Sequence, residues 1–149
     1  MSIDQEVDIL RRIPIFAQID PAKLKLMAFA SERVTYKPGQ VLFKEGEQGD
    51  AAYIVLKGTA DILIGGNGEQ IRVASLSENE IIGEIAILCD IPRTATVQAA
   101  TELITLKITT DLFFRMLMDF PEMGVEVMRV LAHRLEQTTA QLRRAQAGS

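Results

Sequence analysis

The spacing of apolar residues divides the chain into a helical beginning, a strand-rich middle and a helical end. In residues 1–32, apolar positions three apart predict a short amphipathic helix over 4–12 that ends before Pro14. A second helix is predicted where Asp20 is a suitable N-cap and Pro21 fits the first helical position. We expect both helices to pack on a sheet.

The middle of the chain, residues 33–108, changes to short apolar runs separated by Gly and Asn. The runs predicted to be strands are 40–44, 51–56, 60–64, 70–76 and 95–99. Strands of this length, repeating at about 8–12 residues, are typical of an all-β sandwich or barrel. The clearest hairpin tip is the Gly-Gly-Asn-Gly segment at 65–68.

Helical spacing returns in residues 109–145. A first helix leads to Pro121, and a longer one is predicted from about 122 towards 144, with apolar positions at alternating three- and four-residue steps that Thr138 interrupts. The apolar face of this long helix has two interpretations, contact with the barrel or a dimer seam. The tail, 145–149, is predicted to be frayed.

Composition narrows the class of protein. At 149 residues with 48% hydrophobic content, the chain is predicted to be a single domain, 1–149, with a core that needs no metal or disulfide. A net charge of −4 and a pI near 5.1 argue against a surface built for nucleic acid, so we expect no nucleic-acid partner. No helix-turn-helix follows the long helix.

The cysteine content and the lack of a targeting pattern give no indication of secretion or of a membrane-spanning segment. Cys89 is the only cysteine, so no internal disulfide or Cys-based zinc site is possible, and His133 is the only histidine, which argues against a metal site. The acidic start lacks a signal-peptide pattern, and no apolar run approaches the roughly 18 residues of a membrane span. We therefore expect a cytoplasmic protein without a membrane partner.

One segment, residues 82–97, combines a glycine-led apolar turn with a single arginine. Gly83 can adopt dihedral angles that other residues avoid, and good helix formers follow it until Pro92. The first N–H groups of a helix are unpaired and carry partial positive charge, so an anion gains hydrogen bonds there. The segment is predicted to bind an anion such as phosphate.

Arg93 and Glu84 supply opposite charges to this segment. The planar guanidinium of Arg93 can hold two phosphate oxygens, and the alternating strand that follows it would fix its position. Glu84 cannot bind phosphate, but its carboxylate can accept hydrogen bonds from sugar hydroxyls. Together the two residues indicate a sugar phosphate. The alternatives are an arginine paired with Asp50 or Asp90, and a carboxylate that only favours the helix dipole.

The segments 83–88 (GEIAIL) and 92–97 (PRTATV) resemble the phosphate-binding cassette of the cyclic nucleotide-binding domain family. The family includes protein kinase regulatory subunits, cyclic nucleotide-gated channels and the catabolite activator protein. Residues 36–50 and 52–58 are also similar to the family's earlier strands and turns, and the resemblance extends over roughly residues 10–135. It implies a mainly β fold: a double-stranded β-helix, jelly-roll-like β-roll with N-terminal helices, a short cassette helix and C-terminal helices.

The resemblance also implies roles for individual residues of the cassette. Arg93 would bind the cyclic phosphate and Glu84 the ribose 2′-hydroxyl. The hydroxyl of Thr94 would bond either the phosphate or the exocyclic amine of a guanine. In this family, threonine at this position is associated with cGMP acceptance but does not exclude cAMP. Four residues would place their backbone near the sugar or phosphate, namely Gly83, Ile85, Ala86 and Ala95.

Residues outside the cassette complete the implied site. Asp50 would orient Arg93, and an apolar bed for the base would be formed by Ile62, Ala74 and Leu76. Arg134 follows Pro121 by thirteen residues, the spacing at which some channel domains place a base-capping arginine on the last helix. The alternative for Arg134 is a solvated helix residue.

The sequence therefore predicts a regulatory module that binds cAMP or cGMP without chemistry or a further cofactor. Ligand occupancy would reposition the C-terminal helix and signal to an effector protein, to an omitted domain or to a homodimer mate. One rival is a nucleotide-independent interaction or dimerisation module on the same fold. The other is a cupin-like enzyme, which usually needs several metal-binding histidines.

Overall fold

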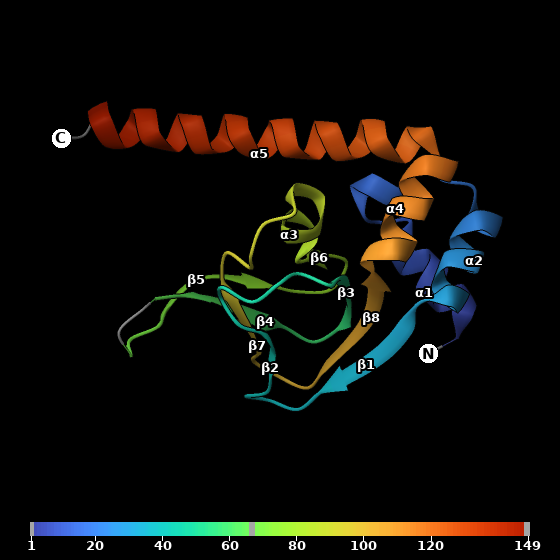
Figure 1. The fold of residues 1–149 in the computed structure, drawn as a ribbon, viewed down its shortest axis with the longest axis horizontal. Coiled ribbons are helices and arrows are strands. Elements are labelled where there is room, and N and C mark those ends of the chain that lie inside the picture. The colour runs from blue at the N-terminus through green and yellow to red at the C-terminus, as the bar shows by residue number, and fades with distance from the viewer. Residues whose placement is uncertain (1, 66–67, 148–149) are drawn as a thin grey trace.

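In a computed structural model, residues 2–65 and 68–147 are described and form two antiparallel sheets with helices at both ends of the chain (Figure 1). One sheet has the order β1-β8-β3-β6 and the other β2-β7-β4-β5. The strands are β1 (Glu32–Tyr36), β2 (Val41–Phe43), β3 (Ala51–Lys57), β4 (Ala60–Ile64), β5 (Ile71–Leu76), β6 (Ile81–Ile82), β7 (Thr96–Ala99) and β8 (Leu103–Thr109). This arrangement confirms the predicted β-roll.

The helices are placed before, within and after the strands. They are α1 (Ile3–Leu10), the short 3-10 helix η1 (Pro14–Phe16), α2 (Pro21–Ala30), α3 (Glu84–Cys89), α4 (Thr110–Asp119) and α5 (Pro121–Ala147). Asp20 caps α2 by accepting a hydrogen bond from the Ala22 amide at 2.8 Å, as its position before a proline predicted. At the start of α1, Ser2 and Gln5 form a capping box that the apolar pattern did not reveal.

The strand β3 is buried on both faces and separates two apolar clusters. Its even-numbered residues, such as Ile54, pack against α1, α2, α4 and α5, whereas its odd-numbered residues, such as Tyr53, face the second sheet. Because successive side chains of a strand point to opposite faces, a continuous apolar run fits this central position. The helices are therefore fixed on one side of the roll, and the interior between the sheets supports the site.

A buried carboxylate links the N-terminal helix to the roll. Glu6 on α1 is 1% exposed and forms an ion pair with Arg33 on β1, with Nε donating at 3.0 Å. A carboxylate buried this deeply needs a partner, because ionised groups lose much of their hydration on burial. The pair thus fixes how α1 packs against the first sheet.

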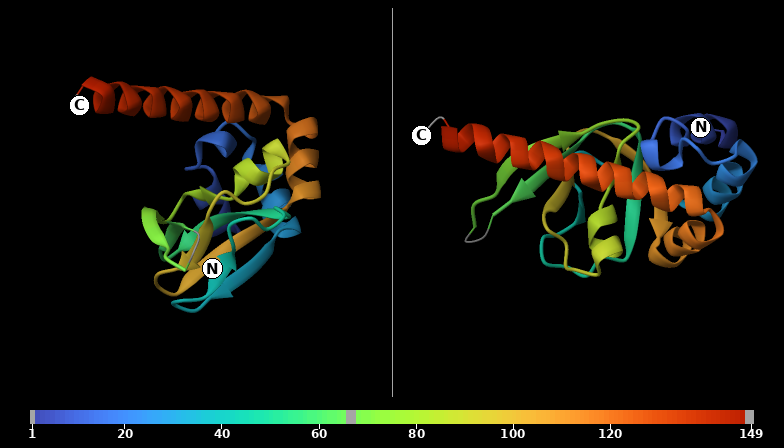
Figure 2. Two further views of the ribbon diagram at one scale, coloured as in Figure 1. Left: turned by 60° about the vertical axis from the view of Figure 1, so that its left-hand side comes forward. Right: turned by 90° about the horizontal axis from the view of Figure 1, so that it is seen from above.

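The apolar contacts between the long helix α5 and the body lie near the beginning of the helix. Met123 and Val127 are buried, and Val130 and Leu131 pack partly against the helix-side cluster. The rest of the helix extends beyond the N-terminal helices and over the roll (Figures 1 and 2). Among the described residues, apolar packing of α5 on the body is therefore seen only as far as Leu131.

Two details differ from or fall outside the sequence-based expectations. The predicted frayed tail is wrong for residues 145–147, because α5 continues to Ala147, and residues 148–149 lie outside the described ranges. The predicted hairpin tip includes residues 66–67, which are also outside those ranges, but the strands β4 and β5 on either side of it are paired as a hairpin requires. Within residues 2–65 and 68–147, none of the helices combines the length and apolar content that crossing a bilayer requires.

Candidate functional site

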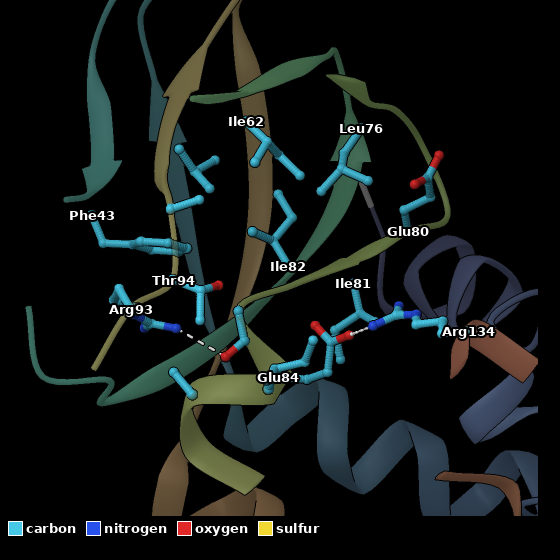
Figure 3. Close-up of a pocket in the computed structure, with 15 residues that line it drawn as sticks. Phe43, Ile62, Leu76, Glu80, Ile81, Ile82, Glu84, Arg93, Thr94 and Arg134 are labelled. Atoms are coloured by element: carbon cyan, nitrogen blue, oxygen red, sulfur yellow. Dashed lines mark hydrogen bonds and ion pairs between the residues drawn. The ribbon is translucent and has the colours of Figure 1, made fainter. Parts of the chain in front are cut away.

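A cavity of about 380 Å³ opens between the cassette, the inner strands of the roll and α5 (Figure 3). Arg93 lies on one side of it, Glu84 and Arg134 lie on the other, and apolar strand residues form the wall between them. Clefts of this size that combine an apolar lining with a few polar groups are typical of small-molecule sites. The predicted cassette therefore lines a real pocket.

The turn at Gly83 brings backbone close to the arginine. Gly83 precedes α3 with φ +84°, a conformation that favours glycine, and a Cβ there would overlap Arg93 Nη1 and lie 3.3 Å from the ring of Phe43. The first residues of α3, including Ile85 and Ala86, line the pocket. The glycine thus permits both the turn and the close approach of the guanidinium.

Arg93 is a buried cation held by backbone carbonyls. It is 3% exposed, and its Nη1 donates to Gly83 O at 2.9 Å while Nη2 donates to Ala51 O at 2.7 Å. Its own backbone is bonded to the loop before β3, with Arg93 N donating to Glu47 O at 2.7 Å and Gly46 N donating to Arg93 O at 2.8 Å. These bonds fix the backbone from which the Arg93 side chain extends to the wall of the pocket.

The environment of Arg93 leaves donors for an anion. Among the described residues, its buried Nε has no hydrogen-bond partner, and Asp50 Oδ1 lies 3.6 Å from Nη2 as an ion pair. Burial lowers the pKa of Arg93, while nearby acidic groups oppose this shift, and a guanidinium remains charged at neutral pH. A buried cation with an unpaired donor beside a cavity is suited to bind an anionic ligand.

Glu84 lies on the opposite side of the pocket and already has a partner. It is a buried residue at the start of α3, and its Oε1 pairs with Nη1 of Arg134 from α5. The side chain of Arg134 is 44% exposed and reaches the carboxylate from the side of the cavity away from Arg93 (Figure 3). The last helix is thereby connected directly to the cassette.

Most of the predicted site residues meet at this cavity. The lining includes Ile62, Leu76, Gly83, Glu84, Ile85, Ala86, Arg93, Thr94, Ala95 and Arg134. Asp50 pairs with Arg93 but is 74% exposed and is not part of the lining. Ala74 is exposed on β5 and is not part of the lining either. Asp90, the other carboxylate considered for Arg93, is exposed at the end of α3.

Several lining residues were missed by reasoning from the sequence. These are Phe43, Glu80, Ile81, Ile82 and Val97. Ile82 and Val97 lie within the predicted cassette, and Ile81 directly precedes it, but none of the three was predicted to line the site. No local pattern indicates that Phe43 lines the pocket, because its place beside Arg93 depends on the pairing of β2 with a strand more than 50 residues later.

The pocket combines charged and apolar groups but offers no cluster of metal ligands among the described residues. In the described part of the chain, no group of three or more His, Cys, Asp or Glu side chains is placed to hold a metal ion. The pocket offers a cation and backbone amides at one side, a carboxylate at the other and apolar side chains between them. These features are complementary to a ligand that combines a negative charge, hydroxyl groups and an apolar part.

Comparison with known proteins identifies the family. The sequence profile of the cyclic nucleotide-binding domain matches residues 33–120, which include most of β1, the cassette and α4. The chain belongs to the cyclic nucleotide-binding domain family.

Curated relatives include regulators of two kinds. The chain is 29% identical over 136 residues to a CRP-like cAMP-activated global transcriptional regulator of Mycobacterium tuberculosis, covering 91% of this chain and 61% of that protein. It is 36% identical over 108 residues to a cAMP-dependent protein kinase regulatory subunit of Yarrowia lipolytica, covering 72% of this chain and 28% of that protein. The chain therefore spans less than two thirds of the length of either relative.

Solved structures confirm the fold. The N-terminal domain of a transcriptional regulator from Streptomyces coelicolor A3(2) matches with a TM-score of 0.74 and 32% identity, covering 90% of this chain and 94% of that one. The regulatory domain of Toxoplasma gondii PKA, solved with cAMP, matches with a TM-score of 0.72 and 26% identity, covering 76% of this chain and 43% of that one.

Proposed function

We propose that this chain is a regulatory module that binds cAMP or cGMP and performs no chemistry on it. The main support is the buried Arg93, whose Nε has no partner among the described residues, placed across a cavity from Glu84. A cyclic phosphate would take the donors of Arg93 and the amides of the α3 turn, while the ribose 2′-hydroxyl would donate to Glu84. The apolar residues Ile62 and Leu76 would contact the base.

Calorimetric titration with cAMP and cGMP tests this function directly. We expect both nucleotides to release or absorb heat on binding, and their relative affinity to show which base the pocket prefers, because Thr94 is exposed at the pocket where it could reach a guanine amine. The open-chain nucleotide 5′-AMP is the matched control, since it carries a second negative charge and lacks the cyclic phosphate. The absence of binding by either cyclic nucleotide at millimolar concentration would contradict the proposal.

The ion pair between Glu84 and Arg134 offers a route from the pocket to α5. If a ribose hydroxyl donates to the Glu84 carboxylate, it competes with or rearranges the contact from Arg134, so the ligand interacts differently with different placements of α5. Such a difference in affinity is what a ligand needs in order to shift a conformational equilibrium. We propose that occupancy is signalled by repositioning of α5.

Hydrogen exchange with an Arg134→Ala variant tests this coupling. In the unmodified chain, saturating cAMP is expected to change the exchange of residues 122–142, and the variant is expected to lose most of this change. Because Arg134 is half-exposed, we expect its removal to alter nucleotide affinity by no more than about fivefold. An exchange profile of α5 that ligand leaves unchanged in the unmodified chain would refute the coupling without refuting binding.

The outer part of α5 carries an exposed apolar repeat. Met128, Leu135 and Leu142 recur at seven-residue steps and are 64%, 68% and 61% exposed. Apolar residues at this repeat are typical of a two-stranded coiled coil, although Thr138 weakens the seam. We therefore propose that the outer part of α5 pairs with the α5 of a second copy.

Sedimentation velocity tests the dimer. The unmodified chain is expected to sediment as a dimer and Leu135→Glu as a monomer, because the substitution places a charge in the apolar seam. Glu136→Gln, an exposed neighbour on the same helix, is the control and should remain dimeric. A monomeric unmodified chain would count against the proposed interface.

The rival functions have less support. A nucleotide-independent interaction module would need no buried cation beside an open cavity, and the calorimetric titration distinguishes it from the main proposal. A regulatory rather than enzymatic role agrees with the names of the relatives described above. The cytoplasmic location, the effector and the absence of a nucleic-acid partner stay predictions.

A further inference from the structure

The aromatic ring of Phe43 covers the buried arginine. Its centroid lies 3.9 Å from Arg93 Cζ, which is a close cation–π contact (Figure 3). Phe43 ends β2, where the register with β7 shifts between Val41 and Phe43. Irregularities of this kind redirect a side chain, and here the ring lies at the pocket wall.

The ring is itself held in place by the interior of the roll. It packs against Tyr53 with ring centroids 6.1 Å apart and an interplanar angle of 32°. Tyr53 is 4% exposed and makes an edge-on contact with Tyr36 at 6.4 Å. A partly buried ring supported in this way has little freedom to move away from the guanidinium.

The two hydrogen bonds of the Arg93 guanidinium restrain its position more than its tilt. Hydrogen bonds to Gly83 O and Ala51 O fix the two terminal nitrogens, but the group can still tilt about the line that joins those nitrogens. Tilting would swing Nε, which lies off this line and lacks a partner in the described structure. A ring placed over Cζ opposes such a tilt.

We propose that Phe43 is a positioning residue that holds the Arg93 guanidinium in the orientation required for the phosphate of a cyclic nucleotide. Phe43 acts through Arg93 and not through a contact of its own with the ligand. The proposal rests on the proposed function, because a role in orienting Arg93 for a phosphate requires that the chain binds a cyclic nucleotide.

Nucleotide affinity provides the first test, with a double-mutant cycle. Phe43→Leu and Phe43→Met remove the ring but keep an apolar side chain, and each is expected to weaken cAMP binding about tenfold. Phe43→Tyr keeps the ring and is expected to bind within about threefold of the unmodified chain. In an Arg93→Gln background, Phe43→Leu should cause no further loss.

The NMR signal of the Arg93 side chain provides a second test that needs no ligand. A ring over Cζ shields the nearby Nε–H proton, so the signal is expected upfield in the unmodified chain and in Phe43→Tyr. In Phe43→Leu and Phe43→Met it should move downfield. The signal is assigned by its disappearance in Arg93→Gln, and urea unfolding shows which variants are folded.

The outcomes separate this proposal from the proposed function. Equal losses from Phe43→Leu in the unmodified and Arg93→Gln backgrounds would mean that the ring contacts the ligand directly, and would overturn the proposal. An Nε–H signal that does not respond to removal of the ring would overturn it as well. If the unmodified chain binds neither cyclic nucleotide, the proposed function fails and the binding role of Phe43 fails with it, whereas the NMR test still shows whether the contact exists.

Discussion

Replacing Arg93 with alanine is expected to weaken cyclic nucleotide binding at least about 100-fold. A hydrogen bond to a charged group contributes roughly 1.5–3 kcal/mol, and about 1.4 kcal/mol corresponds to a tenfold change in affinity. The side chain is 2% exposed, so water cannot readily replace it, and a phosphate in the pocket would lose its main counter-charge. Calorimetry with cAMP measures the effect.

Arg93→Lys is the matched control for charge. Lysine keeps the positive charge but lacks the planar fork that can bond Gly83 O, Ala51 O and a phosphate at the same time. We expect its affinity to fall between those of the unmodified chain and the alanine variant. Normal cAMP affinity in Arg93→Ala would contradict the assignment of this residue to the phosphate.

The alanine variant also needs a measurement of folding. Removing Arg93 leaves the carbonyl oxygens of Gly83 and Ala51 without the donors that they have in this structure, and Ala51 is fully buried. A buried acceptor that loses its donor destabilises a protein by roughly 1–3 kcal/mol. Urea unfolding of the ligand-free variant therefore separates a loss of binding from a loss of structure.

The cassette could be predicted from the sequence because its determinants are local. Gly83, Glu84 and Pro92 set the turn, the helix start and the end of the apolar run within one short segment. The same holds for the cap at Asp20 and for the runs that form β3 and β4. In each case, the residues that determine the element lie beside one another in the chain.

Contacts between distant segments could not be predicted in this way. The pairing of Glu84 with Arg134 depends on how α5 leaves α4, and the ring of Phe43 meets Arg93 because β2 pairs with β7. Ala74 illustrates the converse: it pairs with Ile62 as neighbouring strands require, yet it is exposed, because β5 is the edge strand of its sheet. An apolar pattern identifies a strand without giving its place in the sheet.

The long helix shows the same limit on a larger scale. A repeat of apolar residues at three- and four-residue steps fits both packing on the body and pairing with another helix. In the structure, Val127 belongs to the first kind of contact, whereas Leu135 and Leu142 have no cover within the chain. The contact interpretation therefore applies to the first part of the helix, whereas the dimer seam stays a prediction for the outer part.

Removing the ribose 2′-hydroxyl is expected to weaken binding about 10–100-fold through the loss of its bond to Glu84. A hydroxyl that donates to a carboxylate forms a charge-assisted hydrogen bond of roughly 1.5–3 kcal/mol. The carboxylate is only 10% exposed, so water would replace the missing partner poorly. Competition binding with cAMP and 2′-deoxy-cAMP measures the difference.

A variant at Glu84 shows whether this carboxylate is responsible. Glu84→Ala should bind cAMP about as weakly as the unmodified chain binds 2′-deoxy-cAMP, and it should no longer distinguish the two nucleotides. Arg134→Ala is the control: it removes the other partner of the carboxylate and should retain the distinction. If Glu84→Ala still prefers cAMP by the full factor, the hydroxyl is recognised elsewhere, and Glu84 would then serve to hold α5 through Arg134 and not to bind the sugar.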